Sequence, residues 1–276
     1  MSKSSFRIIH FSDLHAGFFS LQHGGFLDKR LFGCLNHLLR RRRQFRAERL
    51  QSAAKVFAAL KADFFVCTGD LTSVGDPQEF ALAEKLLAPI LELAGDRFLY
   101  IPGNHDAYTN YPACRKALED CFYRLNNKRF ELHDLPQSQT FGPAEFILCN
   151  AAYPSPFFSS NGEIPEPDWK QLQKLLDAPR CTPFRLLLEH FPTRDAMGFP
   201  LTWRRKLKQA ELLQQYHREK RFDVLLCGHI HHPFCLTAPH PQIQCAGSLT
   251  LNASFGLLDI NTQNDTCDVS CQYLPQ

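Results

Sequence analysis

Short apolar runs alternate with amphipathic helical patterns along most of the chain. The apolar runs predict strands, each with the turn that follows it, at 7–11, 63–70, 97–106, 145–153, 184–192 and 222–231. The helical patterns between them lie at 28–61, 77–94, 113–124, 167–178 and 204–220. Further strands joined by turns are expected within 243–274. This alternation indicates an α/β domain with a largely parallel sheet, and without a repeat or a low-complexity linker we expect one domain over residues 1–276.

The turns after these strands carry side chains that can bind metals. Five groups follow five strands: Asp13 with His15, Asp70, Asn104 with His105 and Asp106, His190, and His229 with His231. Glycine precedes three of the groups, at Gly69, Gly103 and Gly228, which allows sharp turns and close backbone approach. Ligands of open α/β sheets bind at the carboxyl ends of strands. The five groups can therefore converge on one site.

Each group taken alone also has an ordinary structural interpretation. A His-x-His pair after a strand is more often a polar cap than a metal site, and Asp13 or Asp70 could simply serve a turn. Strand alternation should point Glu189 away from the site, and His232 is expected at its rim. No motif includes the remaining histidines, at positions 10, 23, 37, 133, 217 and 240, so a structural role is expected for them.

The groups together are far more specific than any one of them. The order Asp13-Leu-His15, Gly69-Asp70, Gly103-Asn104-His105-Asp106, His190 and Gly228-His229-Ile-His231 resembles the calcineurin-like metallophosphoesterase superfamily, including its bacterial-type phosphohydrolases. The motifs span residues 13 to 231, in the family's order. The resemblance implies a four-layer α/β sandwich of two mixed β-sheets flanked by helices, which agrees with the alternating pattern.

The resemblance also implies two divalent metal ions and a role for each motif residue. Asp13, His15 and His231 would hold one ion, Asn104, His190 and His229 the other, and Asp70 would bridge them. His105 would serve the leaving-group oxygen as a proton or hydrogen-bond donor, and Asp106 would orient His105 or its loop. A nitrogen and oxygen donor set suits Mn first, with Fe, Zn and Co as alternatives. Such a metal pair lowers the pKa of a bound water to about 7.

The implied activity is a phosphohydrolase that cleaves a phosphoester or pyrophosphate bond with a metal-bound hydroxide. One alternative is a class III cyclic nucleotide phosphodiesterase, because the Gly-Asn-His-Asp form at 103–106 resembles that branch. A second is a non-catalytic metal-binding scaffold, although every motif residue is present. Nucleic acid is not expected as a partner, because the basic run at 40–46 belongs to a helical pattern and the net charge is only +3.

Composition and the placement of the cysteines favour a cytoplasmic protein. Hydrophobic residues make up 44% and charged residues 21% of the chain, as in soluble globular proteins. Three of the eleven cysteines, Cys67, Cys149 and Cys227, lie inside apolar runs, as reduced core cysteines do. The N-terminal segment has no signal-peptide pattern, and no apolar run reaches the ~20 residues that span a bilayer.

Loops near the motifs are unusually apolar and have basic neighbours. The apolar residues are Phe18, Phe19, Leu21, Phe26, Phe157, Phe158, Met197, Phe199, Leu201 and Trp203, and the basic ones are Lys29, Arg30, Arg40 to Arg43, Arg204 and Arg205. These side chains either cover the sheet edges or form one patch that contacts the inner face of a membrane. The patch suggests a lipid-linked or sugar-nucleotide substrate, such as the UDP-diacylglucosamine cut by lipid A pathway members of the superfamily, and a phosphorylated small molecule is the other class of substrate expected.

Overall fold

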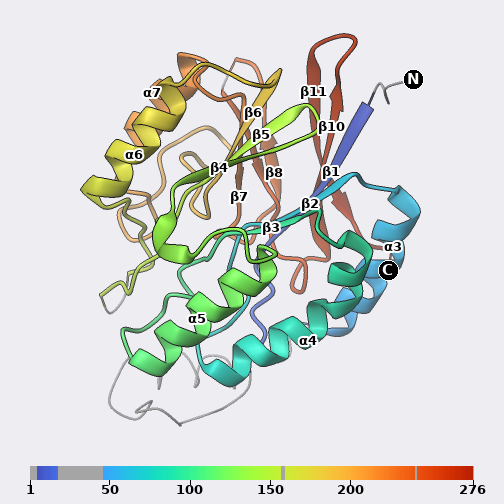
Figure 1. The fold of residues 1–276 in the computed structure, drawn as a ribbon, viewed down its shortest axis with the longest axis vertical. Helices are drawn as coiled ribbons and strands as arrows, with labels where there is room; N and C mark the ends of the chain where they lie inside the picture. Colours follow the sequence, from blue (N-terminus) through green and yellow to red (C-terminus); the bar gives the residue numbers. More distant parts are fainter. Residues whose placement is uncertain (1–4, 18–45, 157–158, 240, 276) are drawn as a thin grey trace.

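The computed structural model describes residues 5–17, 46–156, 159–239 and 241–275, and two β-sheets lie at its centre (Figure 1). One sheet has the strand order β11-β10-β1-β2-β3, with β1 (Ser5–Phe11), β2 (Phe64–Cys67), β3 (Phe98–Tyr100), β10 (Ser254–Asn261) and β11 (Thr266–Tyr273). The other has the order β4-β5-β6-β7-β9-β8, with β4 (Gln137–Phe141), β5 (Ala144–Leu148), β6 (Phe184–Leu188), β7 (Val224–Cys227), β8 (Phe234–Leu236) and β9 (Gln242–Cys245).

Helices cover the outer faces of both sheets. The first sheet is flanked by α3 (Glu48–Leu60), α4 (Pro77–Ala94) and α5 (Pro112–Leu125), and the short 3₁₀ helix η2 (Leu132–Asp134) follows α5. On the far side of the molecule, α6 (Glu166–Asp177) and α7 (Ala210–Arg218) flank the second sheet (Figure 1). The expected four-layer α/β sandwich is therefore confirmed.

Both sheets are mixed, so the simpler expectation of one largely parallel sheet is wrong. The centre of each sheet is parallel, through β1-β2-β3 and β5-β6-β7-β9. Antiparallel strands complete the edges: β10 and β11 in the first sheet, and β4 and β8 in the second. The strand β2, with the sequence Phe-Phe-Val-Cys, is apolar throughout, because both faces of a central parallel strand are buried.

Most of the predicted elements are present, and α4 begins and ends at the predicted residues. Its start is encoded locally, because Asp76 accepts a hydrogen bond from the Gln78 N–H and forms a capping box with Glu79. The helix expected at 204–220 is shorter, since residues 204–209 form a turn before α7. The helix expected at 28–61 is present as α3, and its part before residue 46 lies outside the described residues.

The parallel strands set the position of the candidate site. The loops that follow β1, β2 and β3 in one sheet, and β6 and β7 in the other, carry all five polar groups. The two sheets therefore bring their carboxyl ends together at one edge of the sandwich. Within the described ranges, no helix is both long and apolar enough to cross a membrane.

Candidate metal centre

The loops of the site contain residues with a backbone conformation that residues other than glycine rarely adopt. Five of the seven predicted metal residues have positive φ: Asp13 (56°), His15 (48°), Asp70 (54°), His229 (72°) and His231 (58°). Such conformations are uncommon for non-glycine residues and concentrate at functional sites. Backbone hydrogen bonds hold two of the loops together, from Asp13 N to Gly69 O (2.9 Å) and from His15 N to Asp70 O (2.9 Å).

Two glycines allow the carboxylates to approach the backbone. A Cβ atom at position 103 would lie 2.3 Å from Asp70 Oδ1, and one at position 228 would lie 2.4 Å from Asp13 Oδ2. Both contacts are far shorter than van der Waals distance, so the loops after β3 and β7 require glycine there. The close backbone approach expected from Gly103 and Gly228 is confirmed.

One cluster joins the first sheet to the second. Ligand atoms of Asp13, His15, Asp70 and His231 all lie within 4.8 Å of one another, and together they could hold a metal ion. Asp13 Oδ1 lies 3.6 Å from His15 Nε2 and 3.3 Å from His231 Nε2. His15 Nδ1 donates to the Thr72 carbonyl (3.3 Å), so Nε2 carries the lone pair that faces the cluster. Metal-binding histidines commonly donate their other N–H in this way.

A second cluster lies directly beside the first. Asn104 Oδ1 is 2.8 Å from His229 Nδ1 and 3.3 Å from His190 Nε2. His190 Nδ1 donates to the Thr68 carbonyl (2.6 Å), so Nε2 faces the cluster and carries the lone pair once the ring is neutral, the form that binds a metal. Asp70 Oδ2 connects the clusters, because it lies 3.6 Å from His15 Nε2 and 3.5 Å from His190 Nε2. All seven predicted metal residues are thus brought together.

Several buried atoms of the clusters have no hydrogen-bond partner. Asp13 Oδ1, Asp70 Oδ2 and His229 Nε2 make no hydrogen bond to any described residue. An unsatisfied buried polar group costs about 1–3 kcal/mol, and a charged one costs more. Two carboxylate oxygens and an imidazole nitrogen are ligand types that divalent metals accept. The donor set therefore fits metal ions placed between these atoms.

The pKa values show that the clusters attract positive charge. Burial disfavours a charged carboxylate, but the neighbouring rings of His15 and His231 outweigh it and hold the pKa of Asp13 well below its usual range. For Asp70, His190 and His105 outweigh burial in the same way and lower its pKa. Burial also disfavours an imidazolium at position 190, yet Asp70 raises the pKa of His190 to about 10. Two carboxylates stay ionised here and favour a cation between them.

His105 and Asp106 follow Asn104 but face different surroundings. The backbone N–H of His105 donates to Asp70 Oδ1 (2.7 Å), and its Nδ1 donates to the Ser73 carbonyl (2.6 Å). Asp106 is buried and accepts hydrogen bonds from the backbone N–H of Thr72 (2.9 Å), the hydroxyl of Tyr100 (2.8 Å) and the N–H of Gly103 (3.0 Å). Its carboxylate thus holds the loops after β2 and β3 together, through hydrogen bonds to these loops and to Tyr100 of β3.

The clusters open into a cavity of about 190 Å³. Its walls include His105, Asn104 and His229, and also two residues that the motifs do not contain, Ser160 and Arg205. Arg205 is the one cationic side chain, histidines aside, among the described residues that line it. Backbone hydrogen bonds fix its loop against 160–162, including Ser160 N to Arg204 O (2.8 Å). From the sequence, Arg205 could be identified only as a basic neighbour of the apolar loops, because it belongs to none of the metal-binding motifs.

The histidines outside the motifs, together with His232 and Glu189, lie in different surroundings. His10 is buried between Gln244 and Thr68, at 3.0 and 2.8 Å, and His217 Nε2 donates to the Asp223 carbonyl (2.8 Å). His133 and His232 are exposed, while positions 23, 37 and 240 lie outside the described residues. Glu189 is buried, and Oε2 accepts from the Phe191 N–H (2.7 Å). Desolvation raises the pKa of Glu189 to about 8.

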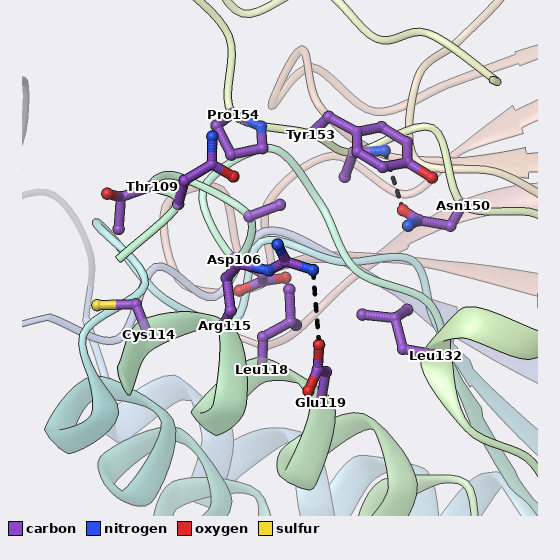
Figure 2. A pocket seen from close by; sticks show the side chains of 13 residues that line it. Asp106, Thr109, Cys114, Arg115, Leu118, Glu119, Leu132, Asn150, Tyr153 and Pro154 are labelled. Carbon is purple, nitrogen blue, oxygen red and sulfur yellow. Dashed lines mark hydrogen bonds and ion pairs between the residues drawn. The ribbon is translucent and has the colours of Figure 1, made fainter. Parts of the chain in front are cut away.

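A second cavity of about 200 Å³ adjoins the same loops (Figure 2). Asp106 and Ala107 contribute from the loop after β3, and the loop after β5 contributes Asn150, Ala152, Tyr153 and Pro154. One side is formed by α5 through Leu118 and its neighbours. The sequence pattern contains no signal for this cavity, because its lining comes from four separated segments.

Comparisons in sequence and in three dimensions agree with this geometry. A sequence model described as calcineurin-like phosphoesterase matches residues 6–233. No curated protein matches the chain. Among solved structures, a dimetal phosphatase from Danio rerio is similar, with 14% identity, 92% of each chain covered and a TM-score of 0.59. GAP50, the anchor in the inner membrane complex of Plasmodium, has 13% identity, with 99% of this chain and 86% of that one covered and a TM-score of 0.59.

A putative 5′-nucleotidase from Staphylococcus aureus is also similar, with 18% identity and a TM-score of 0.57. The alignment covers 99% of this chain and 54% of that one, so the chain spans about half the length of the nucleotidase. At these identities the three likenesses show a shared fold.

Proposed function

Because the chain belongs to the calcineurin-like phosphoesterase family, we propose that it is a phosphoester hydrolase whose loops hold two divalent metal ions. The ligands of one ion would be Asp13, His15 and His231, those of the other Asn104, His190 and His229, with Asp70 between them. The observation that carries the proposal is the position of Asp70 Oδ2, about equally far from His15 Nε2 (3.6 Å) and His190 Nε2 (3.5 Å), with no hydrogen-bond partner among the described residues.

The metal ions and the side chains around them would have separate roles in hydrolysis. Divalent ions bound here would neutralise charge on the phosphoryl oxygens and make a water molecule more acidic. Because His105 Nδ1 donates to the Ser73 carbonyl, Nε2 is the nitrogen that remains for the substrate, and in the protonated ring it would donate to the leaving-group oxygen. Arg205, on the opposite loop of the cavity, would bind a non-bridging phosphate oxygen. Asp106 would act as a positioning residue by holding the loop that carries His105.

Metal content and turnover of the metal-loaded protein test this assignment. We expect two equivalents of divalent metal, with manganese as the best activator and iron, zinc or cobalt as substitutes. Hydrolysis of a chromogenic phosphodiester should depend on the metal and be abolished by a chelator. If the protein holds two equivalents of metal and hydrolyses no ester, it is a metal-binding scaffold and the catalytic proposal is wrong.

Arg205 offers a separate test of phosphate binding. Replacing Arg205 by Gln should lower kcat/KM about 10- to 100-fold, because a hydrogen bond to a charged group contributes about 1.5–3 kcal/mol. Lys206→Gln is the matched control, since Lys206 is an exposed neighbouring cation that does not line the cavity. Equal losses in both variants would exclude a specific contact from Arg205.

We also propose that the substrate has an acyl part and is reached at the inner face of a membrane. The loop at 197–205 supports this, because Met197, Phe199 and Trp203 are 74%, 64% and 66% exposed. The Arg204 guanidinium lies 5.1 Å from the centre of the Trp203 ring, and Arg205 follows it. Basic residues beside an apolar patch favour an anionic membrane surface by about 1 kcal/mol each. The other apolar residues of this hypothesis, at 18–26 and 157–158, lie outside the described residues.

Vesicle flotation and substrate comparison test the lipid hypothesis. The protein should float with anionic vesicles, and Phe199→Ser with Trp203→Ser should abolish flotation. Leu212→Ser is the control, because Leu212 is 46% exposed but lies on α7. A nucleoside-diphosphate-linked lipid such as UDP-diacylglucosamine should be hydrolysed faster than a cyclic nucleotide. No flotation together with a preference for cyclic nucleotides would instead support the cyclic nucleotide phosphodiesterase.

A further inference from the structure

The second cavity is built differently from the metal centre. Its inner wall is apolar and includes the buried residues Ala107, Cys114, Leu118 and Ala152. Its polar groups include the buried Asn150, and Thr109, Asn110, Arg115 and Glu119 at more exposed positions. Ligand sites typically combine such an apolar wall with a few polar groups that fix the orientation of the ligand.

The second cavity lies close to the phosphate end of the proposed site. His105 lines the metal cavity, and Asp106 and Ala107, the next two residues, line the second cavity. Successive Cα atoms are about 3.8 Å apart, so the Cα atoms of His105 and Ala107 are separated by at most about 8 Å. The segment after β5 also borders both, through Ala152 on one side and Ser160 on the other. The two cavities are therefore neighbours along two segments of the chain.

Asn150 presents hydrogen-bond donors to this cavity. Its Oδ1 accepts a hydrogen bond from the Ala152 N–H (2.9 Å), which fixes the side-chain amide. No described residue accepts a hydrogen bond from Nδ2, although the residue is only 8% exposed. In Figure 2 the amide group is turned towards the cavity. A ligand with an acceptor on its edge would satisfy these donors.

Tyr153 adds a flat surface at the outer side. Its ring is 39% exposed and lines the cavity, and its hydroxyl donates to Asp168 Oδ2 (3.2 Å). An aromatic ring held in this way can stack on a planar group. The volume of about 200 Å³ is below the ~300–1,000 Å³ of sites for drug-sized ligands, which suits a single ring system and not a pair of acyl chains.

We propose that this cavity binds the nucleobase of the substrate while the phosphate lies at the metal centre. The proposal rests on the proposed function, and it narrows the substrate class to phosphate esters or anhydrides of a nucleoside. Two sources have this chemistry: a cyclic nucleotide, and a nucleoside diphosphate linked to a lipid. In both, the ring stacks beside Tyr153 and its acceptor edge binds the Asn150 amide.

Variants that fill the cavity test the proposal. Ala107→Leu places a larger side chain in the cavity, and Ala210→Leu is the matched control, because the two alanines are 7% and 8% exposed and Ala210 lies on α7. Both variants are assayed on a cyclic nucleotide, a nucleoside-diphosphate-linked lipid and a ring-free alkyl phosphodiester. Ala107→Leu should lower the ratio of kcat/KM for base-bearing to ring-free substrates at least tenfold, and Ala210→Leu should leave it unchanged. An unchanged ratio in Ala107→Leu overturns the proposal.

A second variant tests recognition of the base. Asn150→Asp keeps an acceptor for the Ala152 N–H but replaces the donors by a carboxylate, so the relative KM values for adenine- and uracil-bearing substrates should change at least fivefold. Titration of metal-free protein with free nucleosides gives a readout without turnover, and Ala107→Leu should abolish that binding. Equal effects on all bases, or nucleoside binding that Ala107→Leu leaves intact, would contradict the proposal. If the wild-type protein hydrolyses none of the esters yet binds nucleosides, the proposed function fails and the cavity assignment survives.

Discussion

Replacing His105 by Ala should separate catalysis from metal binding. The substitution removes the ring but keeps the backbone N–H that donates to Asp70 Oδ1 at 2.7 Å, so Asp70 should stay in place and both metal ions should remain. The lost hydrogen bond from Nδ1 to Ser73 should lower the free energy of unfolding by about 1 kcal/mol. The rate should fall by ~10²–10⁴, the usual contribution of an acid–base group. That range corresponds to about 3–5 kcal/mol in the activation barrier.

His229→Ala is expected to behave in the opposite way. It removes a buried ring whose Nδ1 lies 2.8 Å from Asn104 Oδ1, so at least one metal equivalent should be lost together with turnover. Metal analysis and kcat for a chromogenic phosphodiester are measured side by side, with the exposed His133→Ala as the control. The assigned roles are wrong if His105→Ala loses as much metal as His229→Ala, or if it keeps both its metal and its rate.

Three further predictions concern regions away from the metal centre. Glu145→Ala should lower the free energy of unfolding in urea by about 3–5 kcal/mol without changing metal content, because it leaves Arg185 buried without its carboxylate partner at 2.8 Å. Burial lowers the pKa of His217 to about 4 from 6.5, so the unfolded chain binds more protons between these pH values. The free energy of unfolding should therefore rise with pH across that window, by up to about 3 kcal/mol. In the His217→Phe variant, the free energy of unfolding should rise less over the same pH range. Cys235 and Cys271 Sγ atoms lie 3.4 Å apart on β8 and β11, so hydrogen peroxide should convert the two thiols into a disulfide and two water molecules. Mass analysis should show the loss of two hydrogen atoms, which either single Cys→Ser variant should prevent.

Much of the site could be predicted from the sequence, because its chemistry lies in short contiguous motifs. Asp13 with His15, and Asn104 with His105, follow apolar strands directly, and parallel strands bring their carboxyl ends together. The limits of α4 are also local, since Asp76 and Pro77 encode its start. Each of these features depends on a few neighbouring residues, so the pattern along the chain contains the information.

Other features depend on residues that are distant in sequence. The strands β4 and β8 were not predicted, because β4 is half-exposed, β8 has only three residues, and both are defined by pairing with β5 and β9. The antiparallel edges of the second sheet, and the division of the strands into two sheets, depend on this pairing and not on the strand propensity of the local sequence.

The same reason explains what the motifs omit at the site. Arg205 reaches the metal cavity because its loop pairs with the segment at 160–162, which lies more than forty residues earlier in the chain. The second cavity likewise joins Ala107, Leu118 and Asn150 from separate elements. Sequence alone therefore determined the candidate metal residues and the family to which the chain belongs, because local motifs encode both. Only the tertiary structure decided which side chains line the two cavities, because those contacts arise from packing between distant segments.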